Sequence, residues 1–137
     1  MAGLPDAVEI DLLKQLTGQA TTIFTTTPYT PWLGLFTVAP TDATAGTEAT
    51  GGGYARINTA GLWGTPAAGQ VQNSSAVTLA AFTGAVSAGA AFVAFGLFTA
   101  ATAGTLIVPG PLTDLTKTGG NGDQIVFAIG DLTVTAD

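Results

Sequence analysis

Carboxylates are nearly the only side chains of this chain that could carry out chemistry. The sequence holds nine acidic residues, three basic residues and neither histidine nor cysteine, so its formal net charge is −6. Paired carboxylates can hydrolyse glycosidic bonds, but none of the acidic residues here lies in a recognisable catalytic motif. The commonest general base, the thiolate nucleophile and the commonest metal ligands are all missing. We therefore predict that the protein is not an enzyme and holds neither a cofactor nor a metal.

Three short motifs are similar to functional sites but lack the partners that such sites require. Asn121-Gly122-Asp123 could open a calcium loop, but further carboxylates are missing around it and a hairpin turn is favoured. Gly51-Gly52-Gly53 could cradle a phosphate, but it precedes a predicted strand and no lysine ends it. We interpret it as the end of a mobile loop. Ser74-Ser75 has no histidine base and no nucleophile elbow, and a lysine-based serine hydrolase is an open but unsupported alternative.

Charge is scarce along the whole chain. Only 9% of the residues are charged and 47% are apolar, whereas ordinary soluble proteins carry about 25% charged residues. The three cations, Lys14, Arg56 and Lys117, are too few to bind nucleic acid or an anionic membrane surface, and no stretch is suited to span a bilayer. An uncharged surface favours contact with other subunits. We therefore predict a homo-oligomer with no nucleic-acid, membrane or small-molecule partner.

One helix is predicted near the start of the chain, over residues 4–17. Pro5 suits its first turn and Gly18 is placed to end it. Such a short helix is marginal alone, so its apolar stripe must dock on its own domain or on a neighbouring subunit. We divide the chain into a helical arm, residues 1–18, and a single β domain, residues 19–137. The stripe consists of Val8, Leu12, Leu13 and Leu16.

The remainder of the chain has the composition of short strands separated by Gly- and Pro-rich turns. We expect a loop over residues 39–53, and a break between two strands at Pro109-Gly110-Pro111. About seven short strands with a turn roughly every ten residues indicate an all-β, antiparallel β-sandwich or barrel-like domain. The predicted strands are Thr21–Thr27, Trp32–Val38, Tyr54–Leu62, Val77–Phe82, Ala91–Thr99, Leu106–Val108 with Leu112–Leu115, Ile125–Ile129 and Leu132–Thr135.

A short phrase occurs twice in this β region. Gly-Leu-Phe-Thr stands at residues 34–37 and again at residues 96–99, and Ala-Thr-Ala-Gly-Thr follows at residues 43–47 and 101–105. We interpret both copies as core strands that are neighbours in the fold. We expect their uncharged loops to leave the sandwich at one rim and to form a contact surface there. Duplication and convergence are both open as the origin of the repeat.

Four larger side chains of the β region are candidates for subunit contacts. Arg56 suits an ion pair across an interface, although an intrachain pair with Glu48 or an aspartate accounts for it equally well. Trp32 and Trp63 could serve as sugar platforms, but without companion site residues they are better explained as core or interface anchors. We therefore assign Trp32, Tyr54, Arg56 and Trp63, together with the helical stripe, as the predicted interface residues.

Several stretches resemble a widespread family of small structural proteins of tailed bacteriophages. Members carry a short helix, a "LFTAAPTD" strand and loop, and a "GTE-SGGGYAR" block, and they are often labelled tail fibre, minor tail or minor capsid proteins. The resemblance implies a virion structural protein without catalytic activity. The similar stretches are Leu35-Phe36-Thr37, Ala39-Pro40-Thr41-Asp42, Gly46-Thr47-Glu48, Gly51-Gly52-Gly53-Tyr54-Ala55-Arg56, residues 93–113 and residues 122–134.

We interpret the chain as a non-enzymatic virion structural protein. The favoured place is the outer surface of the head, where a decoration (cement) trimer would contact the major capsid protein or other virion proteins. Its helix could clamp a neighbouring subunit or the shell. The alternatives are a tail, neck, collar or fibre subunit, and a carbohydrate- or receptor-binding module.

Overall fold

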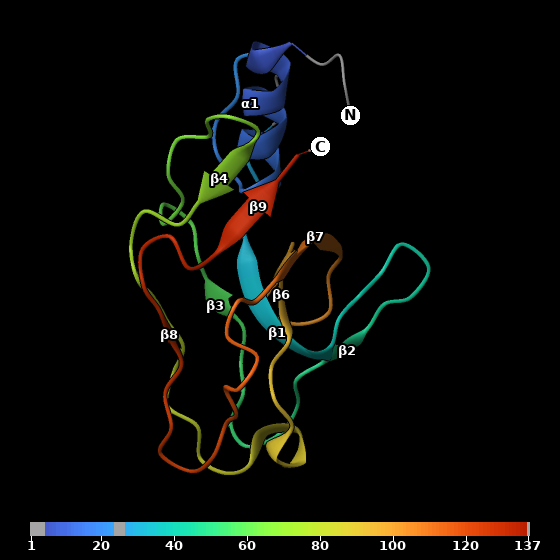
Figure 1. Ribbon diagram of the computed structural model, residues 1–137, viewed down its shortest axis with the longest axis vertical. Coiled ribbons are helices and arrows are strands. Elements are labelled where there is room, and N and C mark those ends of the chain that lie inside the picture. The colour runs from blue at the N-terminus through green and yellow to red at the C-terminus, as the bar shows by residue number, and fades with distance from the viewer. Residues whose placement is uncertain (1–4, 24–26, 137) are drawn as a thin grey trace.

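The computed structural model describes residues 5–23 and 27–136 of the 137-residue chain (Figure 1). Within these residues the protein is mostly β structure with one α-helix, and none of its helices is long and apolar enough to cross a membrane. The elements are α1 Asp6–Leu16, β1 Trp32–Val38, β2 Thr47–Glu48, β3 Ile57–Asn58, β4 Gln70–Gln72, β5 Val77–Thr78, the 3₁₀ helix η1 Val86–Gly89, β6 Ala94–Phe98, β7 Leu106–Pro111, β8 Val126–Phe127 and β9 Thr133–Thr135.

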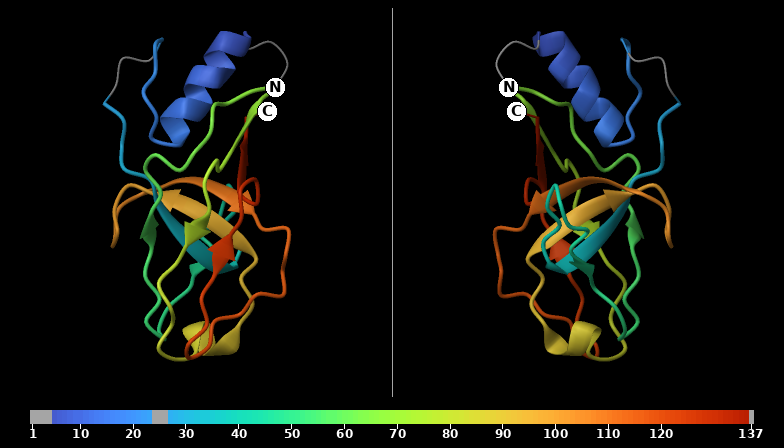
Figure 2. Two further views of the ribbon diagram at one scale, coloured as in Figure 1. Left: turned by 90° about the vertical axis from the view of Figure 1, so that its left-hand side faces the viewer. Right: turned by 90° about the vertical axis from the view of Figure 1, so that its right-hand side faces the viewer.

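Helix α1 lies at one end of the β structure, above the strands in Figures 1 and 2. Pro5 precedes it, and Gly18 ends it as predicted, with a φ of 71° and with the N–H of Gln19 bonded back to the Lys14 carbonyl at 2.7 Å. Leu13 is fully buried in the main core and Leu16 packs against that core. Leu13 and Leu16 of the apolar stripe therefore dock on their own chain, which was the first of the two predicted targets.

One layer of the fold is a five-stranded antiparallel sheet. The order is β2-β1-β6-β7, and β3 pairs with β1 on the same side as β2. The two copies of Gly-Leu-Phe-Thr thus lie on neighbouring strands, as predicted, with Gly34 of β1 opposite Gly96 of β6. Because the pairing is antiparallel, the two following loops leave at opposite ends of the strand pair. The expectation of a shared rim was therefore wrong for the points at which the loops leave, although residues 40–45 and residues 104–105 line one hollow beside β7.

The second layer is a long antiparallel ribbon in which β4 pairs with β9 and β5 pairs with β8. The ladder is interrupted between the two pairs, and the buried side chain of Asn73 closes the gap. Its amide donates to the carbonyls of Ser75 and Ala128, both at 2.9 Å, and its oxygen accepts from the Leu132 N–H at 3.0 Å. The side chain thus bridges the two strands through Ala128 and Leu132, beside the backbone bonds from the Asn73 N–H to the Leu132 carbonyl at 3.2 Å and from the Gly130 N–H to the Asn73 carbonyl at 3.0 Å.

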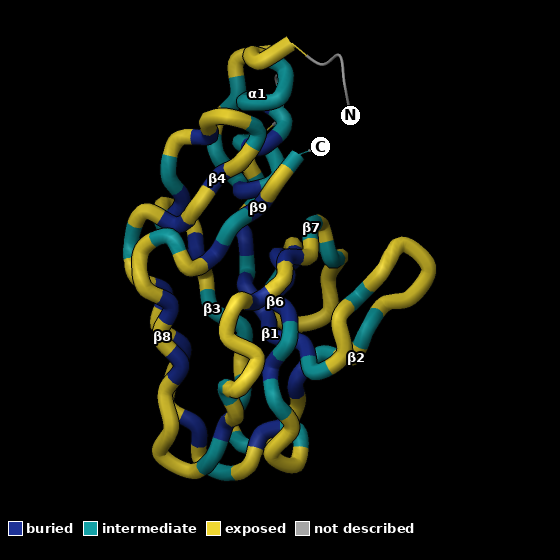
Figure 3. The backbone as a smooth tube through the Cα atoms, in the orientation of Figure 1, coloured by how far each residue is buried: buried dark blue, intermediate teal, exposed yellow. Residues whose placement is uncertain are grey.

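The main core lies between the sheet and the ribbon, where most buried positions of Figure 3 are found. Inward-facing residues such as Leu33, Leu35 and Phe95 of the sheet meet Val71, Phe127 and others of the ribbon. This arrangement confirms the predicted all-β sandwich with a short helix. The core residues are Leu13, Leu33, Leu35, Ala49, Trp63, Val71, Val77, Leu79, Phe82, Val86, Phe92, Phe95, Leu97, Leu112, Ile125, Phe127, Leu132 and Val134.

Several predicted strand boundaries were wrong. Residues 106–111 form one strand, β7, that continues through Pro109-Gly110-Pro111; prolines are tolerated there because β7 is at the edge of the sheet. The strand predicted over Tyr54–Leu62 is reduced to β3, and β2 lies inside the loop predicted over residues 39–53. β4 was not predicted.

The strand predicted over Thr21–Thr27 is also wrong where the structure describes it. Residues 21–23 are irregular because the N–H groups of Thr22 and Ile23 donate to the carboxylate of Asp11, which holds this segment against α1. Residues 24–26 lie outside the described residues, as does Leu4, the predicted helix start.

Candidate functional site

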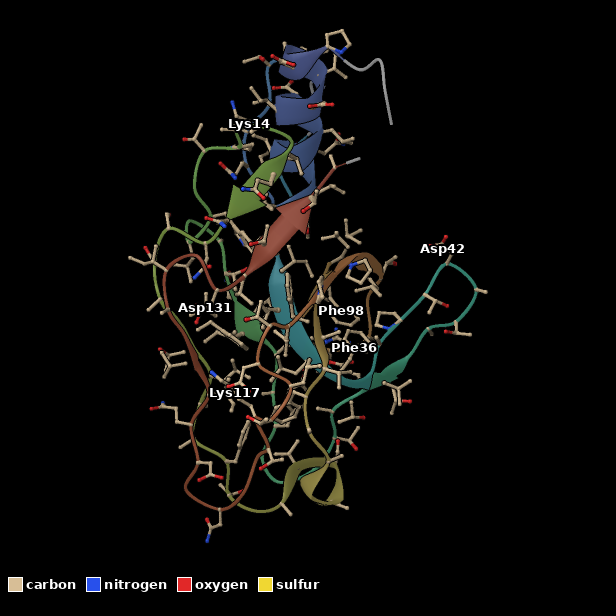
Figure 4. All side chains as sticks on the ribbon, in the orientation of Figure 1. Lys14, Phe36, Asp42, Phe98, Lys117 and Asp131 are labelled. Atoms are coloured by element: carbon tan, nitrogen blue, oxygen red, sulfur yellow. The ribbon has the colours of Figure 1, made fainter. Side chains whose placement is uncertain are left out.

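The outer face of the sheet, opposite the main core, carries a second apolar cluster built on the repeated phrase. A Cβ atom at Gly34 would lie 2.9 Å from the Phe98 ring, and one at Gly96 would lie 2.8 Å from the Phe36 ring. Each glycine therefore leaves the space that the phenylalanine of the other strand fills. The two rings stack with centroids 5.9 Å apart and planes 14° apart, and they are labelled side by side in Figure 4.

Arg56 closes this cluster from the side of β2 and β3. Its Nε and Nη2 donate to the two carboxylate oxygens of Glu48, each at 2.7 Å, and its Nη1 donates to the carbonyls of Ala100 and Ala103 at 2.8 and 2.7 Å. The guanidinium carbon lies 3.5 Å from the centroid of the Phe98 ring. Arg56 thus ties the sheet edge to the loop after β6, and we call these five residues the Arg56 latch.

Tyr54 connects the Arg56 latch to the backbone of β1. Its hydroxyl accepts from the Leu35 N–H and donates to Glu48 Oε1, both at 2.9 Å. Burial raises the pKa of Tyr54 above its ordinary range, so the phenol stays protonated as a donor. The hydrogen bond to Glu48 raises the pKa of Arg56. The residues of the predicted "GTE…GGGYAR" block therefore form one hydrogen-bonded network.

The glycine run inside this block is an anchored turn, so its interpretation as a mobile loop end was wrong. The N–H of Tyr54 donates to the Gly51 carbonyl at 3.0 Å, and the Gly52 carbonyl accepts from the N–H of Thr83 at 2.8 Å. Gly51, Gly52 and Gly53 all have positive φ values, which side-chain-bearing residues rarely adopt. The turn brings Tyr54 and Arg56 back to Glu48.

The structure separates the predicted interface residues into three places. Tyr54 and Arg56 meet at Glu48, and Trp32 packs against the outer cluster. Trp63 is 6% exposed, donates its indole N–H to Thr59, and lies in the main core beside Phe95. The stripe residues Val8, Leu12, Leu13 and Leu16 belong to α1, at one end of the β structure (Figure 1). An interface role remains a prediction for Trp32, Tyr54, Arg56, Val8, Leu12 and Leu16, while Leu13 and Trp63 already pack within their own chain.

The intrachain alternative for Arg56, a pair with Glu48, is confirmed. The sequence analysis missed Phe36 and Phe98 as a stacked pair and missed the carbonyls of the loop after β6. The repeated phrase was a usable signal for the two rings, because both copies place phenylalanine two positions after glycine. Sequence gave no signal for the carbonyls, since their role comes from the path of the backbone.

Arg56 donates its hydrogen bonds to groups of its own chain, namely the Glu48 carboxylate and the carbonyls of Ala100 and Ala103. Across residues 5–23 and 27–136, no buried side-chain nitrogen or oxygen lacks a hydrogen-bond partner. The same part of the chain contains no cluster of three His, Cys, Asp or Glu residues suited to a metal ion. The contacts of Arg56 tie the loop after β6 to the sheet edge at Glu48.

Fold and site together define a small β-sandwich whose polar side chains brace its own loops. Residues 3–135 match the family described as podophage GP4 fiber I protein gp80, and the chain belongs to this family. It is therefore a structural protein of the bacteriophage virion, as the resemblance implied. A comparison with curated proteins found no match.

Proposed function

We propose that this protein is a non-enzymatic subunit of a fibre-type appendage of the phage particle. The observation that carries the proposal is the match to a fiber protein family over residues 3–135, nearly the whole chain. The Arg56 latch agrees with a structural role, because Arg56 donates its hydrogen bonds to Glu48 and to two carbonyls of its own chain. In this role the protein acts by assembly, as a homo-oligomer, and in contact with other virion proteins.

The head decoration role favoured by the sequence analysis remains a prediction, and so does its trimeric state. A cement protein and a fibre subunit differ in place and in copy number on the particle. A receptor- or carbohydrate-binding role through Trp63 has no support, because that ring is buried in the main core.

Gold-labelled antibodies against the purified protein, imaged by electron microscopy on intact particles, test the proposal. Label at the tail, neck or fibres, with a copy number far below that of the major capsid protein, is the expected result. Label spread over the head, with a copy number comparable to that of the shell, would replace the fibre assignment with head decoration.

A further inference from the structure

The loop between β1 and β2 projects from the sheet as a flap. The flap, residues 39–46, stands clear of the sheet in Figure 1 and is almost entirely exposed in Figure 3. A groove separates it from β7. Residues 40–45, with Pro40 and Asp42 among them, line the flap side, and residues 104–107 with Pro109 line the strand side. We call this hollow the flap groove.

The flap groove is apolar where it meets the sheet. It adjoins a second hollow that shares Pro40 and Pro109 and is lined further by Val93 and Ala94, with no ionisable side chain among its lining residues. Ile107 is 37% exposed in the groove, and Val38, at the base of the flap, is 56% exposed. Large apolar side chains left open beside an apolar hollow are typical of a surface that another protein covers.

A partner cannot bind here by adding a strand. β7 is the edge of the five-stranded sheet, but Pro109 and Pro111 have no N–H to offer to an incoming strand. A partner must therefore contact the flap groove through side chains.

The distribution of charge favours a second copy of this chain as that partner. Two copies with a net charge of −6 each repel one another wherever carboxylates meet. Described carboxylates are concentrated elsewhere, at Asp6 and Glu9 on α1 and on the segment between β7 and β9, which carries Asp131 on the side away from the flap (Figure 4). The charge of Glu48 is balanced by its ion pair with Arg56, so Asp42 of the flap is the unbalanced carboxylate beside the flap groove.

We propose that the flap groove is the surface through which the protein associates with a second copy of itself. A cationic partner would be drawn to the carboxylates of α1 and of the ribbon, whereas an acidic chain approaches another most easily where carboxylates are fewest, and Asp42 is the carboxylate that lines the groove. This inference rests on the proposed function in one respect, namely that the subunit assembles with itself.

The first test places a charge in the groove. Ile107→Asp should weaken self-association at least about tenfold, since a carboxylate would be buried without a partner, and circular dichroism should show an unchanged fold. Ile129→Asp is the matched control, because Ile129 is 69% exposed on the ribbon side. It should leave the association unchanged. Light scattering after size-exclusion chromatography measures both.

The second test does not depend on a disruptive substitution. The chain has no cysteine, so copies carrying Ala43→Cys can be mixed with copies carrying Ile107→Cys and joined by a short bismaleimide. Crosslinked dimers should form from this mixture and not from Ile129→Cys copies.

The outcomes separate the two proposals. If the wild type is oligomeric and Ile107→Asp associates as strongly, or if only Ile129→Cys copies crosslink, the flap groove is not the contact surface. The fibre assignment would be unaffected by either result. A wild type that stays monomeric alone, or that fills the groove only with a different virion protein, would overturn the second copy as the occupant. Particle labelling then decides the fibre assignment independently.

Discussion

Removal of the Arg56 side chain should destabilise the protein well beyond the loss of an ordinary surface ion pair. An exposed pair contributes less than about 1 kcal/mol. Here the Arg56 side chain is only 9% exposed and Glu48 is 25% exposed, and Arg56 donates two hydrogen bonds to Glu48 and two to carbonyls. Hydrogen bonds to charged groups contribute about 1.5–3 kcal/mol each when well buried. Glu48 is partly exposed, and solvent weakens its hydrogen bonds, so we take a stabilisation well below the sum over the four bonds.

Arg56→Ala should therefore lower the free energy of unfolding by about 3 kcal/mol. For a domain of this length each kcal/mol corresponds to roughly 3–4 °C in Tm, so Tm should fall by about 10 °C. Urea and thermal unfolding, followed by circular dichroism, measure both quantities. Hydrogen exchange should also rise in residues 99–105, which Arg56 holds, and stay unchanged in the flap.

Two control variants separate geometry from charge. Arg56→Lys keeps the charge but loses the planar fork and should recover part of the stability. Lys14→Ala removes a cation near the end of α1 and should cost less than about 1 kcal/mol. A Tm drop below about 3 °C for Arg56→Ala, equal to that of Lys14→Ala, would show that the latch is only a surface pair and would refute this reasoning.

Three further predictions concern other contacts. Gly34→Ala should cost about 1–3 kcal/mol in denaturant unfolding because its Cβ would meet the Phe98 ring, whereas Gly84→Ala, in ordinary contact, should cost less. Asn73→Ala should cost about 2–4 kcal/mol, since the Leu132 N–H and the Ser75 carbonyl lose their Asn73 partner while the Ala128 carbonyl keeps the Asp131 N–H; a smaller loss would argue that water takes the place of the amide. Burial raises the pKa of Tyr29 and Tyr54, so the folded state retains protons that the unfolded chain releases. Stability should be full below about pH 10 and fall above it, and Tyr→Phe at both positions should flatten the Tm against pH.

The elements predicted correctly are those whose signal is local. α1 has an apolar stripe bounded by Pro5 and Gly18, and β1 and β6 are unbroken apolar runs. β7 was mispredicted because prolines end a central strand but not an edge strand, and only the strand order shows that β7 is at the edge. The position of a strand in the sheet is a tertiary property, which the residues of the strand do not encode by themselves.

The site was predictable only in part, for the same reason. Glu48 was named, beside the aspartates, as one possible intrachain partner of Arg56. Tyr54 and Arg56 are two positions apart and both reach the Glu48 carboxylate, although residues 54–56 form no strand; the glycine turn before them sets this path. The sequence thus offered the pair as one of several alternatives, while the backbone path that selects it comes from contacts distant in sequence.

Packing accounts for the repeated Gly-Leu-Phe-Thr phrase without a duplication. Around the Gly34–Gly96 pair, each strand supplies a glycine that leaves space and, two positions later, a phenylalanine that fills the space left by the other. Two antiparallel strands that share this contact must both carry Gly-x-Phe. The loops that follow make different contacts, since residues 99–105 are held by Arg56 and residues 39–46 form the flap. The similar loop sequences therefore make different contacts in the two copies. This favours convergence, in which both strands acquired Gly-x-Phe for the same packing, over duplication of one ancestral unit.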